Sequence, residues 1–213
     1  MNKYAIKIVK EEKYFLQMIN ELRNEYGTMR KGDTYMSEER LDKKYNEFLN
    51  SELEVAGAFD KNKLVGFVSY KITPDGLYGD NIFVFKGHRG GCVGTLLVKH
   101  LEKYAKQNNC SQIYFGARRS ANKFYFKLGF EGSCLIQSDK ATKQDLENLM
   151  KRYNITEYSY NLYTGCNPPV NQIRLNAKHM DNNILIEEID NSELDIGCIL
   201  TFSKKIPNSI KEL

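Results

Sequence analysis

A glycine-rich loop between an expected strand and an expected helix constrains this chain more than any other feature. Gly90, Gly91 and Gly94 lie within five residues and follow the strand-like stretch Leu77–Phe85, and apolar residues at helical spacing continue to Tyr104. A helix N-terminus offers unpaired N–H groups and the positive end of a dipole, and glycine lets the backbone approach an anion closely. The segment therefore predicts a pyrophosphate-binding loop, with an ordinary glycine-rich turn as the alternative.

The sequence lacks the two commonest nucleotide-binding motifs. The patterns G-x-x-x-x-G-K-S/T and G-x-G-x-x-G are both absent. The expected elements are, in order, a strand at Tyr4–Val9, a helix at Glu12–Tyr26, a helix capped by Ser37, and strands at Val55–Phe59, Leu64–Ile72 and Leu77–Phe85. Because strands and helices do not alternate, we do not expect the parallel sheet of a dinucleotide-binding fold.

Composition and charge exclude several classes of protein. Apolar residues make up 41% and charged residues 27% of the 213 residues, as in ordinary globular domains. No apolar run approaches the roughly 18 residues of a membrane span, and Lys7 and Lys10 interrupt any signal peptide. The net charge of +4 does not require a nucleic-acid partner. Its excess lies in residues 1–139, which favours an anionic ligand there.

The cysteine pattern bears on the cellular compartment. The chain has five cysteines, Cys92, Cys110, Cys134, Cys166 and Cys198. Their number is odd, their spacing is wide, and no C-x-x-C pair occurs. A disulfide framework and a structural zinc site are therefore not expected, and the pattern favours a reducing, cytoplasmic location.

Two segments carry a resemblance to a known family. Arg89–Leu97, with Val84 five residues before it, resembles the acyl-CoA loop Q/R-x-x-G-x-G/A of the GCN5-related N-acetyltransferases, the GNAT superfamily. Phe124–Phe130 resembles the F-Y-x-K-x-G-F segment of the same family. The resemblance covers roughly residues 3–137. It implies an α/β fold with a mixed α+β sheet, the GNAT acyl-CoA N-acyltransferase fold. It also implies an enzyme that moves an acetyl group from acetyl-CoA to a primary amine.

The resemblance also implies a set of cofactor contacts. The backbone N–H groups of the loop would hold the CoA pyrophosphate, and the preceding strand would pair with the pantetheine amides like an added strand. The implied contacts are Ile82, Phe83, Val84, Arg89, Gly90, Gly91, Cys92, Val93, Gly94, Thr95, Arg118 and Lys127, and no metal is expected.

Two of these positions depart from the family pattern. Cys92 stands where the loop usually has glycine, so the loop forms freely only if this residue does not need a positive φ. Arg118 stands where many members have an asparagine that contacts the cofactor. An arginine could reach a phosphate instead, but it does not replace the usual amide hydrogen bond.

Two residues are candidates for proton transfer. Tyr125 would act as the general acid that protonates the departing thiolate, and its alternative role is packing among phenylalanines. Asp80 is the only carboxylate on the strand before the loop and would act as the base. Its alternative role is a hydrogen bond at a bulge marked by Gly79. No His and carboxylate stand at motif spacing around Cys92, which favours direct transfer over a covalent acyl-enzyme.

The sequence says less about the amine that accepts the acetyl group than about the cofactor. The connection Thr28–Met36 would build the acceptor side, and we favour a small-molecule amine over a protein N-terminus or lysine. A second hypothesis is an acyl-CoA-binding sensor or partner subunit without turnover. The substitutions Cys92 and Arg118 and the extra C-terminal region favour it.

The chain divides into an expected GNAT domain, residues 1–139, and a small α+β region, residues 140–213. The second region begins with a helix, Thr142–Tyr153, capped by Thr142 with Asp145 three residues later. Strand-like stretches follow at Thr156–Tyr163, Gln172–Leu175, Ile184–Ile189 and Ile196–Phe202. Because a sheet this small needs cover for its apolar face, we expect it to dock on the first domain, either of its own chain or of a partner in a homodimer.

Overall fold

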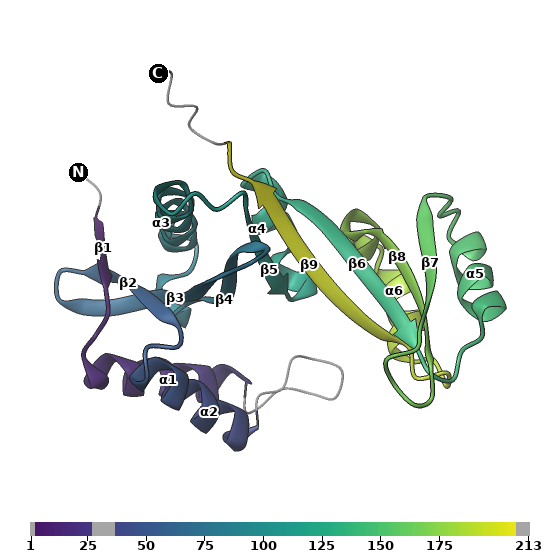
Figure 1. The fold of residues 1–213 in the computed structure, drawn as a ribbon, viewed down its shortest axis with the longest axis horizontal. Coiled ribbons are helices and arrows are strands. Elements are labelled where there is room, and N and C mark those ends of the chain that lie inside the picture. Colours follow the sequence, from purple (N-terminus) through teal and green to yellow (C-terminus); the bar gives the residue numbers. More distant parts are fainter. Residues whose placement is uncertain (1–2, 27–36, 208–213) are drawn as a thin grey trace. The chain divides into compact units, whose positions relative to one another are not determined.

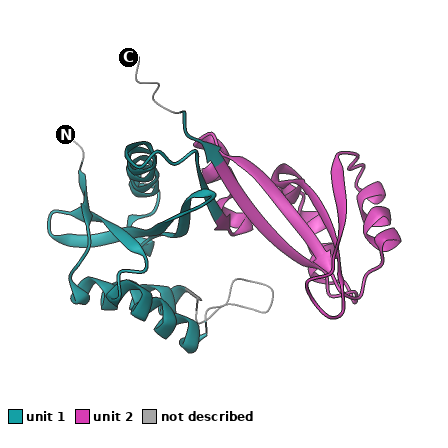
Figure 2. Cartoon of the chain, viewed as in Figure 1, with its two compact units in different colours: residues 1–115, 204–213 teal, residues 116–203 magenta. Residues whose placement is uncertain are grey.

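The computed structural model describes residues 3–26 and 37–207. The chain forms two compact units, which are coloured separately in Figure 2. Unit 1 holds residues 1–115 and 204–213, and unit 2 holds residues 116–203. The chain therefore leaves unit 1 once and returns to it near its end.

Unit 1 is a sheet with helices on both faces (Figure 1). Its elements are β1 (Tyr4–Ile8), α1 (Glu12–Tyr26), α2 (Glu38–Leu49), β2 (Glu54–Asp60), β3 (Lys63–Thr73), β4 (Gly76–Val84), the 3₁₀ turn η1 (Lys86–His88), α3 (Val93–Gln107) and β5 (Gln112–Ala117). The strand order is β1-β2-β3-β4-β5. The first three pairings are antiparallel and β4 pairs with β5 in parallel. This is the mixed sheet that the sequence predicted.

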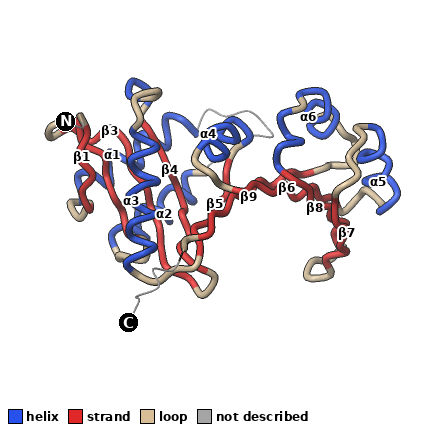
Figure 3. The backbone as a smooth tube through the Cα atoms, turned by 90° about the horizontal axis from the view of Figure 1, so that it is seen from above, coloured by secondary structure: helices blue, strands red, loops and turns tan. Residues whose placement is uncertain are grey.

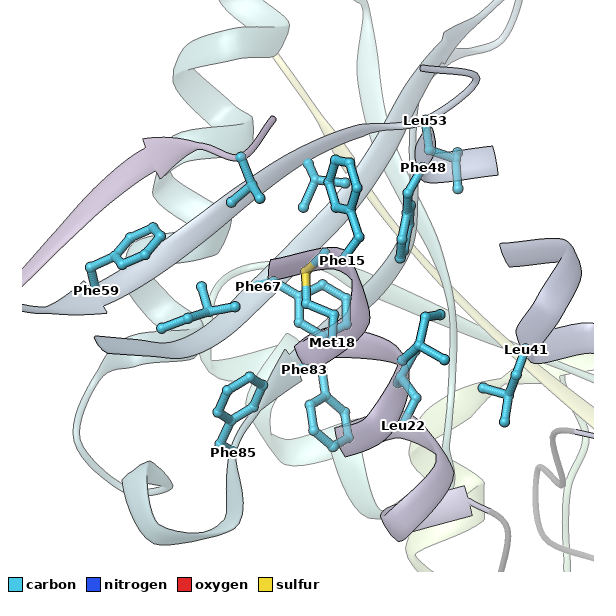
Figure 4. Packing of buried hydrophobic residues seen from close by; sticks show 14 residues of the cluster. Phe15, Met18, Leu22, Leu41, Phe48, Leu53, Phe59, Phe67, Phe83 and Phe85 are labelled. Carbon is cyan, nitrogen blue, oxygen red and sulfur yellow. The ribbon is translucent and has the colours of Figure 1, made fainter. Parts of the chain in front are cut away.

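One face of this sheet is covered by α1 and α2 through a cluster of large apolar side chains (Figure 4). The cluster includes Phe15, Met18 and Leu22 of α1, Leu41 and Phe48 of α2, and Phe59, Phe67 and Phe83 of the sheet. The predicted cap of α2 is present, since the Arg40 N–H donates to Ser37 Oγ at 3.2 Å. Truncating a buried phenylalanine of such a cluster to alanine costs roughly 3–5 kcal/mol, so the cluster holds both helices firmly on β2–β4.

Helix α3 covers the opposite face of the unit 1 sheet (Figure 1). Its buried stripe consists of Val93, Leu97, Val98, Leu101 and Ala105. Apart from the adjacent pair Leu97 and Val98, these residues are spaced three or four apart, which is the pattern of an amphipathic helix packed on one side. The stripe fixes the start of α3, and with it the glycine-rich loop, against the end of β4.

Unit 2 contains the antiparallel strand order β9-β6-β8-β7, which Figure 3 shows in red. Its elements are η2 (Arg119–Ala121), α4 (Asn122–Lys127), β6 (Glu131–Ser138), α5 (Lys143–Arg152), β7 (Tyr158–Tyr163), β8 (Val170–Asn176), η3 (Ala177–Asp181), α6 (Asn183–Asp190) and β9 (Gly197–Lys205). The capping box expected at the start of α5 is present between Thr142 and Asp145. Strands β7, β8 and β9 match expected strand stretches.

One predicted strand is wrong. Residues 184–189 lie in helix α6, whose N-cap Asn182 accepts hydrogen bonds from the N–H groups of Ile184 and Leu185. Leu185 and Ile189, four residues apart, are buried, whereas Ile184 is 69% exposed. The run of β-branched residues favoured a strand, but the helical spacing of its buried members and the asparagine cap decide for a helix.

Strand β9 brings the chain back to a position beside β6. Strand β9 pairs with β6 from Glu131↔Ser203 to Gln137↔Gly197, so residues 139–196 are inserted between two neighbouring strands. After β9 the chain is held in unit 1, where the Ile206 N–H donates to the Ser111 carbonyl at 2.9 Å. The compact units thus divide the chain elsewhere than residue 139, and the expected functional division at that residue stays a prediction.

Candidate active site

The glycine-rich loop is built at the junction of β4, η1 and α3. Gly90 has a φ of +80°, and a side chain added there would meet no atom within 4 Å. The loop is therefore open on that side. Helix α3 begins at Val93, so the N–H groups of its first turn, which lack partners within the helix, lie directly after the loop. The arrangement has room and donors for an anion.

Cys92 is the N-cap of α3 and has left-handed backbone angles, φ 65° and ψ 2°. The sequence expectation was that cysteine fits only if this position avoids a positive φ, and the structure does not meet that condition. A left-handed conformation costs a residue other than glycine on the order of 1 kcal/mol. The loop therefore keeps the conformation for which glycine is suited, at some cost in stability.

Arg89, the first residue of the motif, is held by the surrounding protein. Its Nε donates to the Val84 carbonyl at 2.9 Å, and its Nη2 lies 3.1 Å from Glu25 Oε1 at the end of α1. The guanidinium also lies over the Phe83 ring at 5.6 Å. Arg89 thus ties the loop to β4 and α1, and a direct contact with a phosphate stays a prediction.

Strand β4 pairs with β3 along its whole length but with β5 over only its first part. Its parallel pairing with β5 runs from Leu77↔Ile113 to Gly79↔Phe115 and stops there. A side chain added at Gly79 would lie 1.9 Å from the Phe115 ring, so only glycine permits this close approach. Farther along, the three residues expected to contact pantetheine, Ile82, Phe83 and Val84, pair with β3. The point where the β4–β5 ladder ends therefore precedes these three residues.

A β-bulge in β4 presents Asp80. Tyr70 pairs with Gly79 and Ser69 pairs with Asn81, so Asp80 is the extra residue between them. Its Oδ2 accepts from Lys44 Nζ at 2.5 Å, Ser69 Oγ at 2.8 Å and Asn81 Nδ2 at 2.6 Å. The bulge predicted at Gly79 is confirmed, and the carboxylate is fixed in place by three donors.

Sequence reasoning missed Lys44, although α2 carried a signal for it. Lys44 lies three residues after Leu41 and four before Phe48, both of which are buried. It therefore stands on the apolar face of the helix, where only 6% of its side chain is exposed. A lysine at such a position requires an acidic partner, because a buried unpaired charge is strongly unfavourable.

The surroundings of Asp80 include a second ionisable group. Burial, reinforced by the negative charge of Asp80, raises the pKa of Tyr78. The Tyr78 ring packs 5.3 Å from that of Tyr114, whose hydroxyl lies 2.9 Å from Thr73 Oγ1. Tyr78 is therefore a neutral phenol at neutral pH.

The remaining candidates belong to unit 2. Tyr125 lies in α4 with 5% of its surface exposed, and its ring stacks on Phe202 of β9 at 4.8 Å and 19°. Arg118 precedes η2, and Lys127 is the last residue of α4. Phe202 was not expected as a neighbour of Tyr125, because the two residues are distant in sequence.

Within residues 3–26 and 37–207, no group of three or more His, Cys, Asp or Glu side chains could hold a metal ion. None of the helices in these ranges is long and apolar enough to cross a bilayer.

Comparison with known proteins adds family information. The model of the acetyltransferase (GNAT) family matches residues 16–130. No curated protein matches the chain. Among solved structures, an N-acetyltransferase from Staphylococcus aureus Mu50 has a TM-score of 0.51 and 10% identity, covering 82% of this chain and 98% of that one.

Two further structures are similar. A protein assigned to the GNAT acetyltransferases from Desulfovibrio desulfuricans has a TM-score of 0.50 and 11% identity, covering 82% of this chain and 99% of that one. The PaiA N-acetyltransferase from Thermoplasma acidophilum, solved in complex with coenzyme A, has a TM-score of 0.41 and 15% identity. The match covers 81% of this chain and 99% of that one. At these identities the first two similarities establish the fold alone.

Proposed function

Because the chain belongs to the GNAT acetyltransferase family, we propose that it transfers an acetyl group from acetyl-CoA to a small-molecule primary amine. The observation that carries this proposal is the open loop between β4 and α3, with Gly90 at φ +80° directly before a helix N-terminus. A diphosphate needs convergent N–H donors and close backbone approach, and the open glycine loop followed by a helix N-terminus supports this role.

Acetyl-CoA would be held by two parts of unit 1. The N–H groups of the loop, Gly90–Thr95, would bind the pyrophosphate. Ile82, Phe83 and Val84 would align the pantetheine arm by strand-like pairing. The end of the β4–β5 ladder at Gly79↔Phe115 supports this second role, because the arm needs a strand that is not covered by β5. Arg118 and Lys127 of unit 2 are proposed contacts for the phosphates.

The reaction would proceed by direct attack. The neutral amine nitrogen forms a bond to the thioester carbonyl carbon, the carbon–sulfur bond breaks, and the acetyl group moves without a covalent enzyme intermediate. Two protons must be managed. One leaves the attacking nitrogen, and one must reach the departing thiolate.

We assign these protons to Asp80 and Tyr125. Three donors hold Asp80 through Oδ2, which leaves Oδ1 as the oxygen that would receive the proton of the amine. The Tyr125 phenol would supply the proton to sulfur. Its ring is clamped against Phe202 and Phe130, which supports a fixed hydroxyl direction. Packing alone is the alternative role for Tyr125.

The test of the proposal is turnover, read by thiol release. The protein would be mixed with acetyl-CoA and two matched panels, one of small primary amines and diamines, the other of peptides with free N-termini or internal lysines. Release of thiol with the first panel alone supports the proposal. Release with the peptides alone makes the chain a protein acetyltransferase.

Binding without thiol release over both panels would instead identify an acyl-CoA sensor. Binding is measured separately as a rise in melting temperature with acetyl-CoA. Gly94→Glu should abolish this rise, because it puts a side chain and a negative charge beside the pyrophosphate. Lys99→Glu, on the same helix beyond its first turn, controls for charge alone and should keep most of the rise.

The role of the inserted segment is proposed separately. Residues 139–196 would cover part of the acceptor site or join two chains in a homodimer. Sedimentation at several protein concentrations tests the second role directly, since a monomer throughout would exclude it. The cytoplasmic location expected from the cysteine pattern stays a prediction.

A further inference from the structure

Two cysteine thiols are in contact across neighbouring strands of unit 2. Cys134 lies on β6 and Cys198 on β9, and their Sγ atoms are 3.0 Å apart. The strand register pairs Cys134 with Leu200 and Ile136 with Cys198, so both thiols project from the same face of the strand pair and are offset by two residues along it. Figure 1 shows β6 and β9 side by side along their length. Neither thiol has a part in the proposed acetyl transfer.

We propose that Cys134 and Cys198 are a peroxide-sensitive pair that closes to an intramolecular disulfide. A disulfide needs a sulfur–sulfur distance of about 2.05 Å, and the two sulfurs already touch. The ladder between Glu131↔Ser203 and Gln137↔Gly197 continues on both sides of the pair, so the two strands cannot separate easily. Closure would therefore join two sulfurs that are already in contact, between strands that stay paired.

The two thiols differ in burial and in pKa, and this difference indicates which of them reacts first. Cys134 is fully buried, whereas Cys198 is half-buried and can be reached by a small oxidant. The hydrogen bond from the Cys134 thiol lowers the pKa of Cys198, and the Arg119 guanidinium acts in the same direction. Burial of Cys198 and the Asp190 carboxylate oppose this effect. Arg119 is itself held by Asp190 at 2.8 Å, so its position is defined.

The pKa of the partner thiol, Cys134, shifts in the opposite direction. The hydrogen bond to Cys198, together with burial, raises the pKa of Cys134. Arg119 and Arg174 oppose that shift. Because Cys198 is half-buried and Cys134 is fully buried, Cys198 is the sulfur that reacts first with the peroxide, and Cys134 is the sulfur that resolves the product.

The chemistry balances with a peroxide as the oxidant. The Cys198 thiolate attacks one peroxide oxygen, the oxygen–oxygen bond breaks, and Cys198 becomes a sulfenic acid while hydroxide leaves. The Cys134 sulfur then attacks the Cys198 sulfur, and the sulfenic oxygen departs with the Cys134 proton as water. Two thiols lose two hydrogens in total, and hydrogen peroxide is reduced to two waters. A dithiol reductant reverses the bond.

The product would link the two ends of the inserted segment. Residues 139–196 leave after β6 and return before β9, and the new bond would join those two strands. A cross-link of this kind restricts the unfolded chain. The oxidised protein is therefore expected to melt at a higher temperature than the reduced protein.

The experiment uses the full reduced chain and hydrogen peroxide. After brief exposure, remaining thiols are alkylated and the protein is digested and weighed by mass spectrometry. We expect a peptide linking Cys134 to Cys198, a fall from five alkylated cysteines to three, and full recovery with dithiothreitol. The melting temperature should rise with the bond and fall again with the reductant.

Three variants make the result decisive. Cys110→Ser, which removes a buried thiol of unit 1, should leave the link intact. Cys134→Ser should stop the reaction at a sulfenic acid on Cys198, trapped by dimedone, and Cys198→Ser should give no product on Cys134 while the fold persists by circular dichroism. A link between other cysteines, such as the exposed Cys92 and Cys166, would overturn the proposal. Oxidation of Cys198 in the native chain without any link to Cys134 would also overturn it.

Discussion

The Lys44 ammonium lies 2.5 Å from Asp80 Oδ2, and both groups are largely withdrawn from water. The pair joins α2 to the bulge of β4, so one contact ties a covering helix to a candidate catalytic residue. Only 6% of the Lys44 side chain and 18% of the Asp80 side chain are exposed. Removing one member of such a pair leaves an uncompensated charge, which is more damaging than losing the pair.

The first prediction concerns the free energy of unfolding. Lys44→Met should lower it by about 3 kcal/mol, because the Asp80 carboxylate stays in place without its cation. Adding Asp80→Asn to that variant should restore part of the loss, since the stranded charge is gone. Urea unfolding of both single variants and the double variant measures this coupling. Strictly additive losses would show that the two charges do not interact.

The second prediction concerns the proposed general acid. Tyr125→Phe keeps the ring that stacks on Phe202 but removes the hydroxyl. It should lower kcat on the order of 10²-fold while acetyl-CoA affinity is unchanged. Tyr160→Phe, which removes a hydroxyl elsewhere in unit 2, should leave both values alone. An unaltered kcat in the Tyr125 variant would leave that residue a packing role only.

The third prediction follows from the left-handed backbone of Cys92. Cys92→Gly should stabilise the protein by about 1 kcal/mol, because glycine adopts this conformation without strain. Cys92→Val should destabilise it, because a β-branched residue is strongly disfavoured at positive φ. Cys166→Gly, at an exposed cysteine of unit 2, is the matched control and should bring no gain. Equal stability of the glycine and valine variants would rule out strain at this position.

The fourth prediction concerns pH. Burial lowers the pKa of His100, whose Nε2 lies 3.2 Å from the Tyr70 hydroxyl on the α3 side of the sheet. The nearby Glu54 opposes this shift and Lys103 adds to it. Below about pH 6.5 the unfolded chain therefore binds a proton at His100 that the folded chain does not yet accept.

This difference in proton binding at His100 makes the folded protein less stable at low pH. Stability from His100 is fully present above its ordinary pKa, falls as the pH drops below it, and stops falling below the lowered pKa of the folded state. His100→Gln should remove this part of the fall. Urea unfolding at about pH 7.5 and about pH 5.5 tests it, and His88→Gln serves as a surface control. Parallel pH curves for wild type and His100→Gln would contradict the assignment.

Local signals made much of the fold predictable. The Ser37 cap of α2 and the Thr142–Asp145 capping box of α5 both involve residues within three positions of each other, so a single sequence contains the whole interaction. The bulge beside Gly79 was signalled by a glycine within a strand. The error at α6 was also local, because the Asn182 cap outweighs the β-branched run that follows it.

The structural features that the sequence did not predict depend on residues far apart in the chain. Lys44 and Asp80 are 36 positions apart, and their contact requires α2 to lie on β4. The stacking of Phe202 on Tyr125 requires the last strand to return beside β6. The left-handed angle of Cys92 is set by how the loop must turn from η1 into α3, and the residue type alone argued against it. Pattern and propensity do not determine such long-range packing.

The adjacency of β6 and β9 has a consequence for how this chain can diversify. Gln137 faces Gly197, so the polypeptide exits and re-enters through one pair of neighbouring residues. For a flexible connection between fixed ends, each doubling of its length costs only about 0.6 kcal/mol. The turns between the helices and strands of residues 139–196 can therefore change in length at small cost. Strand β8 cannot be lost in the same way, because it pairs with β6 from Ser133↔Asn176 to Ser138↔Asn171.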